Sequence, residues 1–118
     1  MPRKIDVYIN EITAAIADIQ RYIDGFDFNS YVSDGKTKDA VERKLLTAGE
    51  ALNQMSKMNS NVRDQISDFG KIVAFRNILI HGYFGIDDKI VWDILNKKLP
   101  TLKSELETYK NTEAWQFW

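Results

Sequence analysis

Residues 5–23 read IDVYINEITAAIADIQRYI, and this stretch decides the class of fold. Its isoleucines recur at steps of three and four residues, which places them on one face of an α-helix, whereas a strand would alternate every second residue. Gly25 follows as a natural helix end. The stretch therefore predicts an amphipathic helix of about five turns that covers a hydrophobic core. The isoleucines of the stripe are Ile5, Ile9, Ile12, Ile16, Ile19 and Ile23.

The helical period continues along the rest of the chain. Residues 25–37 mix turn formers with aromatics and predict a connection with one helical turn inside it. A second long helix is expected from Lys38, with Thr37 or Asp39 as its N-cap, up to residues 59–61. The stripe of that helix consists of Val41, Leu45, Ala48, Leu52 and Met55.

The last helix is expected to start at Asp87, which is a natural N-cap, and to run to about Tyr109. Pro100 should kink or restart this helix, because proline lacks the amide donor and its ring clashes with the preceding turn. Strand-like alternation, internal repeats and linkers are missing from the sequence. The chain is therefore expected to be a single all-α domain over residues 1–118, an antiparallel bundle of about four main helices with short extra turns.

Composition excludes several classes of function. The 118 residues include no cysteine and one histidine, so thiolate metal sites, disulfides and cysteine nucleophiles are ruled out, and a zinc site would need mainly carboxylates. The sequence holds no apolar run near the roughly 18 residues that cross a bilayer, and its start lacks a secretory signal, so a cytoplasmic protein without membrane contact is expected. A net charge of −1 gives no global attraction to nucleic acid, so RNA contacts would need a local patch or a dimer cleft.

Residues 72–80 are apolar nearly all round the predicted helix, and Arg76, Asn77 and His81 are the strongly polar residues there. Such a helix must be covered on more than one side. Arg76 and His81 are five residues apart, or roughly 140° around a helix, so their spacing alone does not bring them together. Either Gly82 lets the helix end distort, or a second copy packs across a two-fold axis; the apolar surface favours the second copy.

The residues also allow a purely structural interpretation. His81 would then interact with the dipole at the C-terminal end of its helix, and Arg76 would form an ion pair with a glutamate such as Glu50. A basic cluster near the second helix could contact phosphates, or it could be a solvated face paired with Asp34, Asp39 and Glu42. The members of that cluster are Lys36, Lys38, Arg43 and Lys44.

Residues 76–83, RNILIHGY, resemble the R-x4-H-x-Y motif of HEPN-domain ribonucleases, specifically the HepT toxins of toxin–antitoxin pairs. Residues 49–52, 84–87 and 91–92 also resemble that family, and the resemblance spans about Ile5 to Leu106. It implies a HEPN-like homodimer that cleaves single-stranded RNA or tRNA in a cleft on the dimer axis, without a cofactor or a required metal.

The resemblance also implies roles for individual residues. His81 would move a proton during attack on the phosphate, and Arg76 would stabilise charge on the phosphoryl oxygens. Asn77 would position RNA or orient the imidazole, with Glu50 as a further supporting residue. Tyr83 resembles the tyrosine to which an MntA-like nucleotidyltransferase antitoxin transfers AMP, which would block the cleft. The alternative is a non-catalytic helical module that binds a nucleotidyltransferase.

Overall fold

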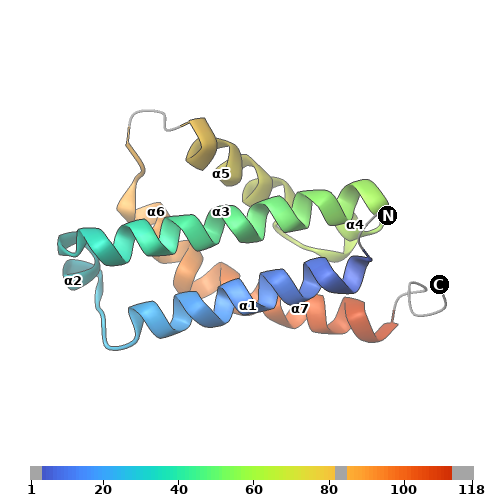
Figure 1. The fold of residues 1–118 in the computed structure, drawn as a ribbon, viewed down its shortest axis with the longest axis horizontal. Helices are drawn as coiled ribbons and strands as arrows, with labels where there is room; N and C mark the ends of the chain where they lie inside the picture. The colour runs from blue at the N-terminus through green and yellow to red at the C-terminus, as the bar shows by residue number, and fades with distance from the viewer. Residues whose placement is uncertain (1–3, 82–84, 113–118) are drawn as a thin grey trace.

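The described residues of the computed structural model, 4–81 and 85–112, are helical throughout apart from short connections (Figure 1), and they contain no strand. This confirms the predicted all-α class. In chain order the elements are α1 (Ile5–Ile23), α2 (Phe28–Ser33), α3 (Gly35–Met58), α4 (Val62–Gln65), α5 (Phe69–His81), α6 (Asp88–Asp93), η1 (Ile94–Lys98) and α7 (Leu99–Thr112).

The core lies between α1, α3 and α7, which run along the long axis of the molecule (Figure 1). The isoleucine stripe of α1 points into it as predicted: Ile12, Ile16 and Ile19 are fully buried, and Ile23 at the helix end is partly buried. Leucines at 95, 99, 102 and 106 supply the opposing side. Burial of this apolar surface is the main term that stabilises the bundle.

The connection before α3 is more helical than its sequence predicted. Asp27 caps α2 through the Ser30 amide at 2.8 Å, and the Ser30 hydroxyl accepts from the Asp27 amide at 2.9 Å. The predicted N-caps of α3, Thr37 and Asp39, are wrong, because Asp34 accepts the Thr37 amide at 3.0 Å and α3 begins at Gly35. Asp34 is the only residue between α2 and α3, and its carboxylate caps the start of α3 directly after α2 ends.

The last helical segment begins where it was predicted, with the Asp87 carboxylate accepting the Lys89 amide at 2.9 Å. The break expected at Pro100 takes the form of a wide π-turn, η1, in which the Leu99 amide donates to the Ile94 carbonyl five residues earlier. A wide turn ahead of the proline accommodates the missing donor and its ring, so the chain stays helical on both sides.

Helix α5 stands at the edge of the bundle (Figure 1). It packs against α3 and lies beside α4, and none of its side chains is fully buried, although its sequence is the most uniformly apolar of the chain. One side of an apolar helix therefore faces away from the core. Within residues 4–81 and 85–112, no helix has the length and apolar character needed to span a membrane.

Candidate active site on α5

Helix α5 approaches α3 closely at Gly49. A Cβ atom added there would lie 2.7 Å from Cβ and 3.2 Å from Cγ of Arg76. No larger residue fits without separating the two helices, because real Cβ atoms essentially never come so close to another heavy atom. Gly49 thus sets the depth at which Arg76 sits against α3.

The guanidinium of Arg76 is held by two neighbours. It forms an ion pair with Glu50 through Nη2, and Nη1 donates to the Asn77 side-chain oxygen at 2.6 Å. The Arg76 side chain is 21% exposed, against 41% for that of Glu50. Its Nε is buried and makes no hydrogen bond to any described residue. Three of the predicted site residues, Arg76, Asn77 and Glu50, therefore lie together.

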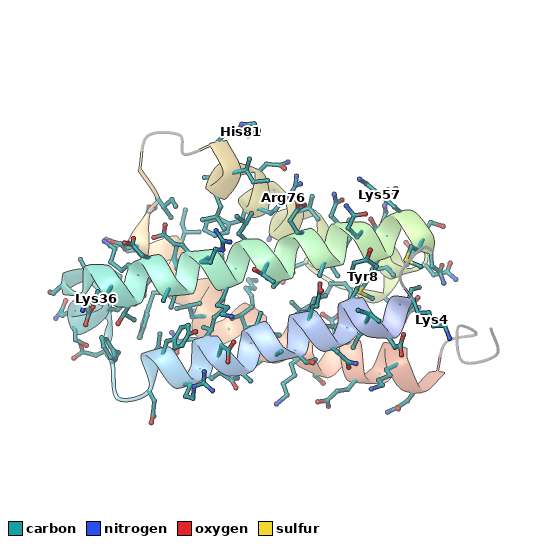
Figure 2. All side chains as sticks on the ribbon, viewed as in Figure 1. Lys4, Tyr8, Lys36, Lys57, Arg76 and His81 are labelled. Atoms are coloured by element: carbon teal, nitrogen blue, oxygen red, sulfur yellow. The ribbon has the colours of Figure 1, made fainter. Side chains whose placement is uncertain are left out.

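His81 lies apart from this group. Figure 2 shows it at the outer end of α5, whereas Arg76 is further back along the helix, next to α3. The imidazole is exposed in the last turn of the helix, where the dipole favours a cation. Tyr83, the predicted modification site, is outside the described residues. A single copy of the chain does not bring Arg76 and His81 together, in agreement with their spacing in the sequence.

The uncovered side of α5 continues onto α6. Ile78 and Ile80 on α5 are 40% and 45% exposed, and Ile90 on α6 is 53% exposed. Ile78 and Ile90 line a mainly apolar groove of about 620 Å³ between α5, α6 and η1. Charges of both signs border the groove: Asp68, Lys71, Lys89, Asp93 and Lys98. Such an apolar floor with a mixed rim resembles the core and rim of a protein interface.

Comparison with known proteins shows the family of the chain. Residues 12–109 match the family model described as ribonuclease HepT-like. The chain belongs to this family. A protein of Methanocaldococcus jannaschii provisionally named an RNase is 30% identical over 107 residues, covering 89% of this chain and 95% of the relative. A second protein of that organism with the same provisional description is 33% identical over 108 residues, covering 91% and 88%.

A third relative carries the family name itself. The probable ribonuclease HepT of Thermococcus cleftensis is 30% identical over 107 residues, which cover 91% of this chain and 96% of the relative. No solved structure matches significantly. The resemblance drawn from residues 76–83 is thereby confirmed at the level of the family, and the matched region includes α5 with Arg76 and His81.

The basic cluster near the start of α3 was expected to pair with Asp34, Asp39 and Glu42, but two of its lysines have other partners. Lys38 bonds to Asp88 at 3.1 Å and Lys44 to Asp18 at 2.9 Å, so the partners come from α6 and α1 rather than from the nearby acids. The Lys44 hydrogen bond lowers the pKa of the Asp18 carboxyl below its ordinary value, and the pKa of Lys44 is raised in turn. Arg43 is exposed and forms no ion pair with any described residue, so it stays available for an anion.

Sequence reasoning missed the role of Gly49 beside Arg76. A glycine inside a helix lowers helix stability, so its presence in the middle of α3 was a signal of close packing. The sequence did not say which helix would approach it, because that depends on how α5 folds back across α3. Within the described residues, no three His, Asp or Glu side chains gather as metal ligands would.

Proposed function

We propose that this chain is a ribonuclease that cleaves single-stranded RNA or tRNA as a homodimer. The observation that carries the proposal is the position of the polar motif: Arg76 and His81 lie on α5, whose apolar outer side is left exposed by the described residues, 4–81 and 85–112. The provisional names of the relatives as ribonucleases agree with this activity.

The homodimer supplies what one chain lacks. Two copies that pack through α5 and the groove beside it would bury Ile78, Ile80 and Ile90, which removes apolar area from water. The acidic groups of the rim are already paired within one chain, Asp68 with Lys98 at 3.3 Å and Asp93 with Lys97 at 3.1 Å, so two copies of the rim can meet without strong repulsion. The same packing would place two copies of His81 and Arg76 at one cleft.

His81 would carry the proton transfer. It removes the proton of a ribose 2′-hydroxyl, the resulting oxygen attacks the adjacent phosphate, and the bond from phosphorus to the 5′ oxygen breaks. The protonated His81 then gives a proton to that leaving oxygen. Imidazole suits both steps because it can accept and give a proton near neutral pH.

Arg76 would stabilise the charge that builds up on the phosphoryl oxygens. Its ion pair with Glu50 and its hydrogen bond to Asn77 restrict the guanidinium before RNA arrives, and such preorganisation is what makes electrostatic stabilisation effective. Arginine offers several N–H donors in one plane, so it can keep one contact with Glu50 while another N–H donates to the phosphate.

Regulation would act through Tyr83. As the toxin of a cytoplasmic toxin–antitoxin pair, the chain would receive AMP on the Tyr83 hydroxyl from an MntA-like nucleotidyltransferase, which uses ATP and releases pyrophosphate. Tyr83 follows His81 by two residues, so an added phosphodiester would bring bulk and negative charge next to the imidazole. RNA, itself an anion, would then be repelled from the cleft.

The test is RNA cleavage by the purified chain and its His81→Ala variant in the presence of EDTA, on labelled single-stranded RNA and on a tRNA mixture. We expect cleavage by the native chain and a loss of about a hundredfold or more in the variant. Gln20→Ala, an exposed change on α1, is the control and should cleave normally.

Mass spectrometry first establishes that Tyr83 carries no AMP. If the unmodified native chain leaves both RNAs intact, yet still binds a nucleotidyltransferase and accepts AMP on Tyr83, the chain is a non-catalytic partner module instead. If His81→Ala cleaves as fast as the native chain, the ribonuclease activity does not depend on the proposed residue.

A further inference from the structure

A second groove lies between α2, α6 and η1, on a face of α6 next to the groove beside α5. Its volume is about 440 Å³, which falls within the roughly 300–1,000 Å³ typical of small-ligand sites. Figure 1 shows α2 and α6 toward the end of the molecule opposite the start of α1. The rings of Phe28 and Trp92 form the apolar part of the groove. Its polar side chains are Lys89, Asp93, Asn96 and Lys97.

The two rings leave room for a third one. The ring centroids of Phe28 and Trp92 are 6.5 Å apart and their planes meet at 60°, and such an edge-to-face contact covers at most one face of Phe28. Phe28 is half-buried and makes no other ring contact with any described residue. Trp92 rests on the fully buried Tyr31, with ring centroids 5.2 Å apart. Trp92 therefore holds Phe28 in place, and the other face of Phe28 can stack on a planar ligand.

Lys89 brings an uncompensated positive charge to this groove. Its side chain is exposed, and its ammonium group forms no ion pair or hydrogen bond within residues 4–81 and 85–112. Lys97 differs, because it is paired with Asp93 at 3.1 Å. An aromatic ring beside a free cation is the combination that binds single-stranded nucleic acid, since the ring stacks on a base and the cation contacts a phosphate.

Asn96 adds hydrogen-bonding groups at the edge of the groove. Its Nδ2 atom donates to the Trp92 carbonyl at 2.8 Å, which fixes the orientation of the amide. The side-chain oxygen of Asn96 accepts no hydrogen bond from the described residues. An amide both donates and accepts, so it can meet the edge of any base.

Lys89 also connects this groove to the proposed dimer contact. The same side chain lines the groove beside α5 and the groove that contains Phe28. A strand that leaves a cleft between two α5 helices and continues over α6 would meet Lys89 first and the aromatic rings next.

From these contacts we infer that the groove between α2, α6 and η1 is a stacking site for an unpaired base of single-stranded RNA, with the adjoining phosphate at Lys89. The inference rests on the proposed ribonuclease function. Bases inside a duplex have both faces covered by their neighbours, so the site favours a single strand and tolerates any base. It gives the strand a second point of attachment besides Arg76.

The experiment measures binding in a background that cannot cut the probe. Fluorescein-labelled hexaadenylate and an abasic hexamer with the same sugar–phosphate backbone are titrated into full-length His81→Ala protein and followed by fluorescence anisotropy. We expect hexaadenylate to bind about tenfold more tightly than the abasic hexamer. Added Phe28→Leu should reduce this preference to less than about threefold, because leucine keeps the apolar volume and cannot stack. Added Phe28→Tyr should retain the preference.

Variants of Lys89 test the phosphate contact. Lys89→Gln should weaken both hexamers by a similar factor and reduce the salt dependence by about one ion, as loss of one phosphate contact does. Lys89→Arg keeps the charge and should restore both. Lys103→Gln is the matched control, because Lys103 on α7 is also exposed and forms no ion pair with any described residue, and it should alter neither hexamer.

The results distinguish this inference from the proposed function. Equal binding of the two hexamers, or a preference that survives Phe28→Leu, overturns the stacking site, and RNA cleavage by the native chain still stands. An unchanged salt dependence in Lys89→Gln overturns the phosphate contact. If neither hexamer binds and the native chain leaves RNA intact, the ribonuclease function falls together with the stacking site. Circular dichroism melting of each variant verifies that it is folded.

Discussion

Gly49 controls the position of Arg76 through a single interatomic contact. The space between α3 and α5 at this point is too small for a methyl group, since an added Cβ would lie 2.7 Å from that of Arg76. Arg76 in turn is restrained by Glu50 and Asn77. A shift of α5 by a few tenths of an ångström would therefore move the guanidinium relative to its partners, and such displacements are costly in a preorganised site.

Gly49→Ala should for this reason lower both stability and activity. We expect a loss of about 1–3 kcal/mol in the free energy of unfolding, as for other overpacked sites, and a drop of about tenfold in RNA cleavage. Urea unfolding and a cleavage assay measure the two effects. Gly70→Ala is the matched control on α5, because nothing lies within 4 Å of the added atom, and its cleavage rate should be unchanged.

Glu42 on α3 makes stability depend on pH. Burial, followed by the neighbouring Asp39 carboxylate, raises the pKa of Glu42 above its ordinary value. A raised pKa means that the folded state binds the proton more tightly than the unfolded state, so stability decreases as pH rises through the window between the ordinary and the raised value. Glu42→Gln should therefore raise the melting temperature by about 1–2 °C at pH 7 and have no effect below pH ~4.

Asp18 should show the opposite sign. The hydrogen bond from Lys44 lowers the pKa of Asp18, so its contribution to stability is present above the ordinary pKa of an aspartate and is lost as pH falls through the lowered value. Asp18→Asn should thus lower the melting temperature at pH 7, and the difference from the native chain should vanish in acid. Parallel melting curves of both variants at pH 7 and at a pH well below the ordinary pKa of an aspartate give the comparison; the same sign for both variants at pH 7 would contradict this account.

At the scale of elements, short-range sequence patterns predicted where individual helices lie and begin. The isoleucine spacing placed α1, and Asp87 marked the start of the last helical segment, because periodicity and capping depend on residues a few positions apart. The start of α3 at Gly35 was missed because Asp34, Thr37 and Asp39 could each cap a helix. Which of them does so depends on where α2 ends.

The parts of the candidate site that lie close together in the sequence were predictable in the same way. Residues 76–81 identified the motif, and their spacing correctly indicated that Arg76 and His81 diverge around the helix. Glu50 was a named candidate partner of Arg76, and the ion pair exists. The groove between α2, α6 and η1 was not foreseen, because its lining comes from residues 28 to 97, and only the packing of α2 against α6 brings Phe28 next to Trp92.

The outer side of α5 yields a test of assembly. Ile80 is 45% exposed and contributes little to the core, so a charge there should leave the folded chain intact while it disrupts a dimer through α5. We expect Ile80→Glu to convert a dimer into a monomer in light scattering with little change in helicity. Val32→Glu on α2, where the exposed fraction is 38%, is the matched control and should remain dimeric.

At the scale of the whole molecule, charge and shape agree with a shared cleft. The chain has a net charge of −1, so RNA is not drawn to the surface as a whole. RNA binding as proposed would rely on local donors such as Arg76 on α5 and Arg43 on α3. Two copies would double these donors at one place, which is the simplest way for a slightly acidic protein to hold an anionic strand.

Mixing of two inactive variants tests the shared cleft directly. In a dimer that joins one Arg76→Ala copy to one His81→Ala copy, one site contains neither residue, whereas the other combines an intact Arg76 from one copy with an intact His81 from the other. Half of the dimers in an equal mixture are of this mixed kind, so the mixture should regain about a quarter of native cleavage if the two residues act across the interface. The subunits are mixed in mild denaturant and refolded, and each variant treated alone serves as the baseline. If the mixture stays as inactive as its components while native mass spectrometry shows that mixed dimers have formed, Arg76 and His81 act within one chain. The distortion near Gly82 then becomes the better explanation of how they meet.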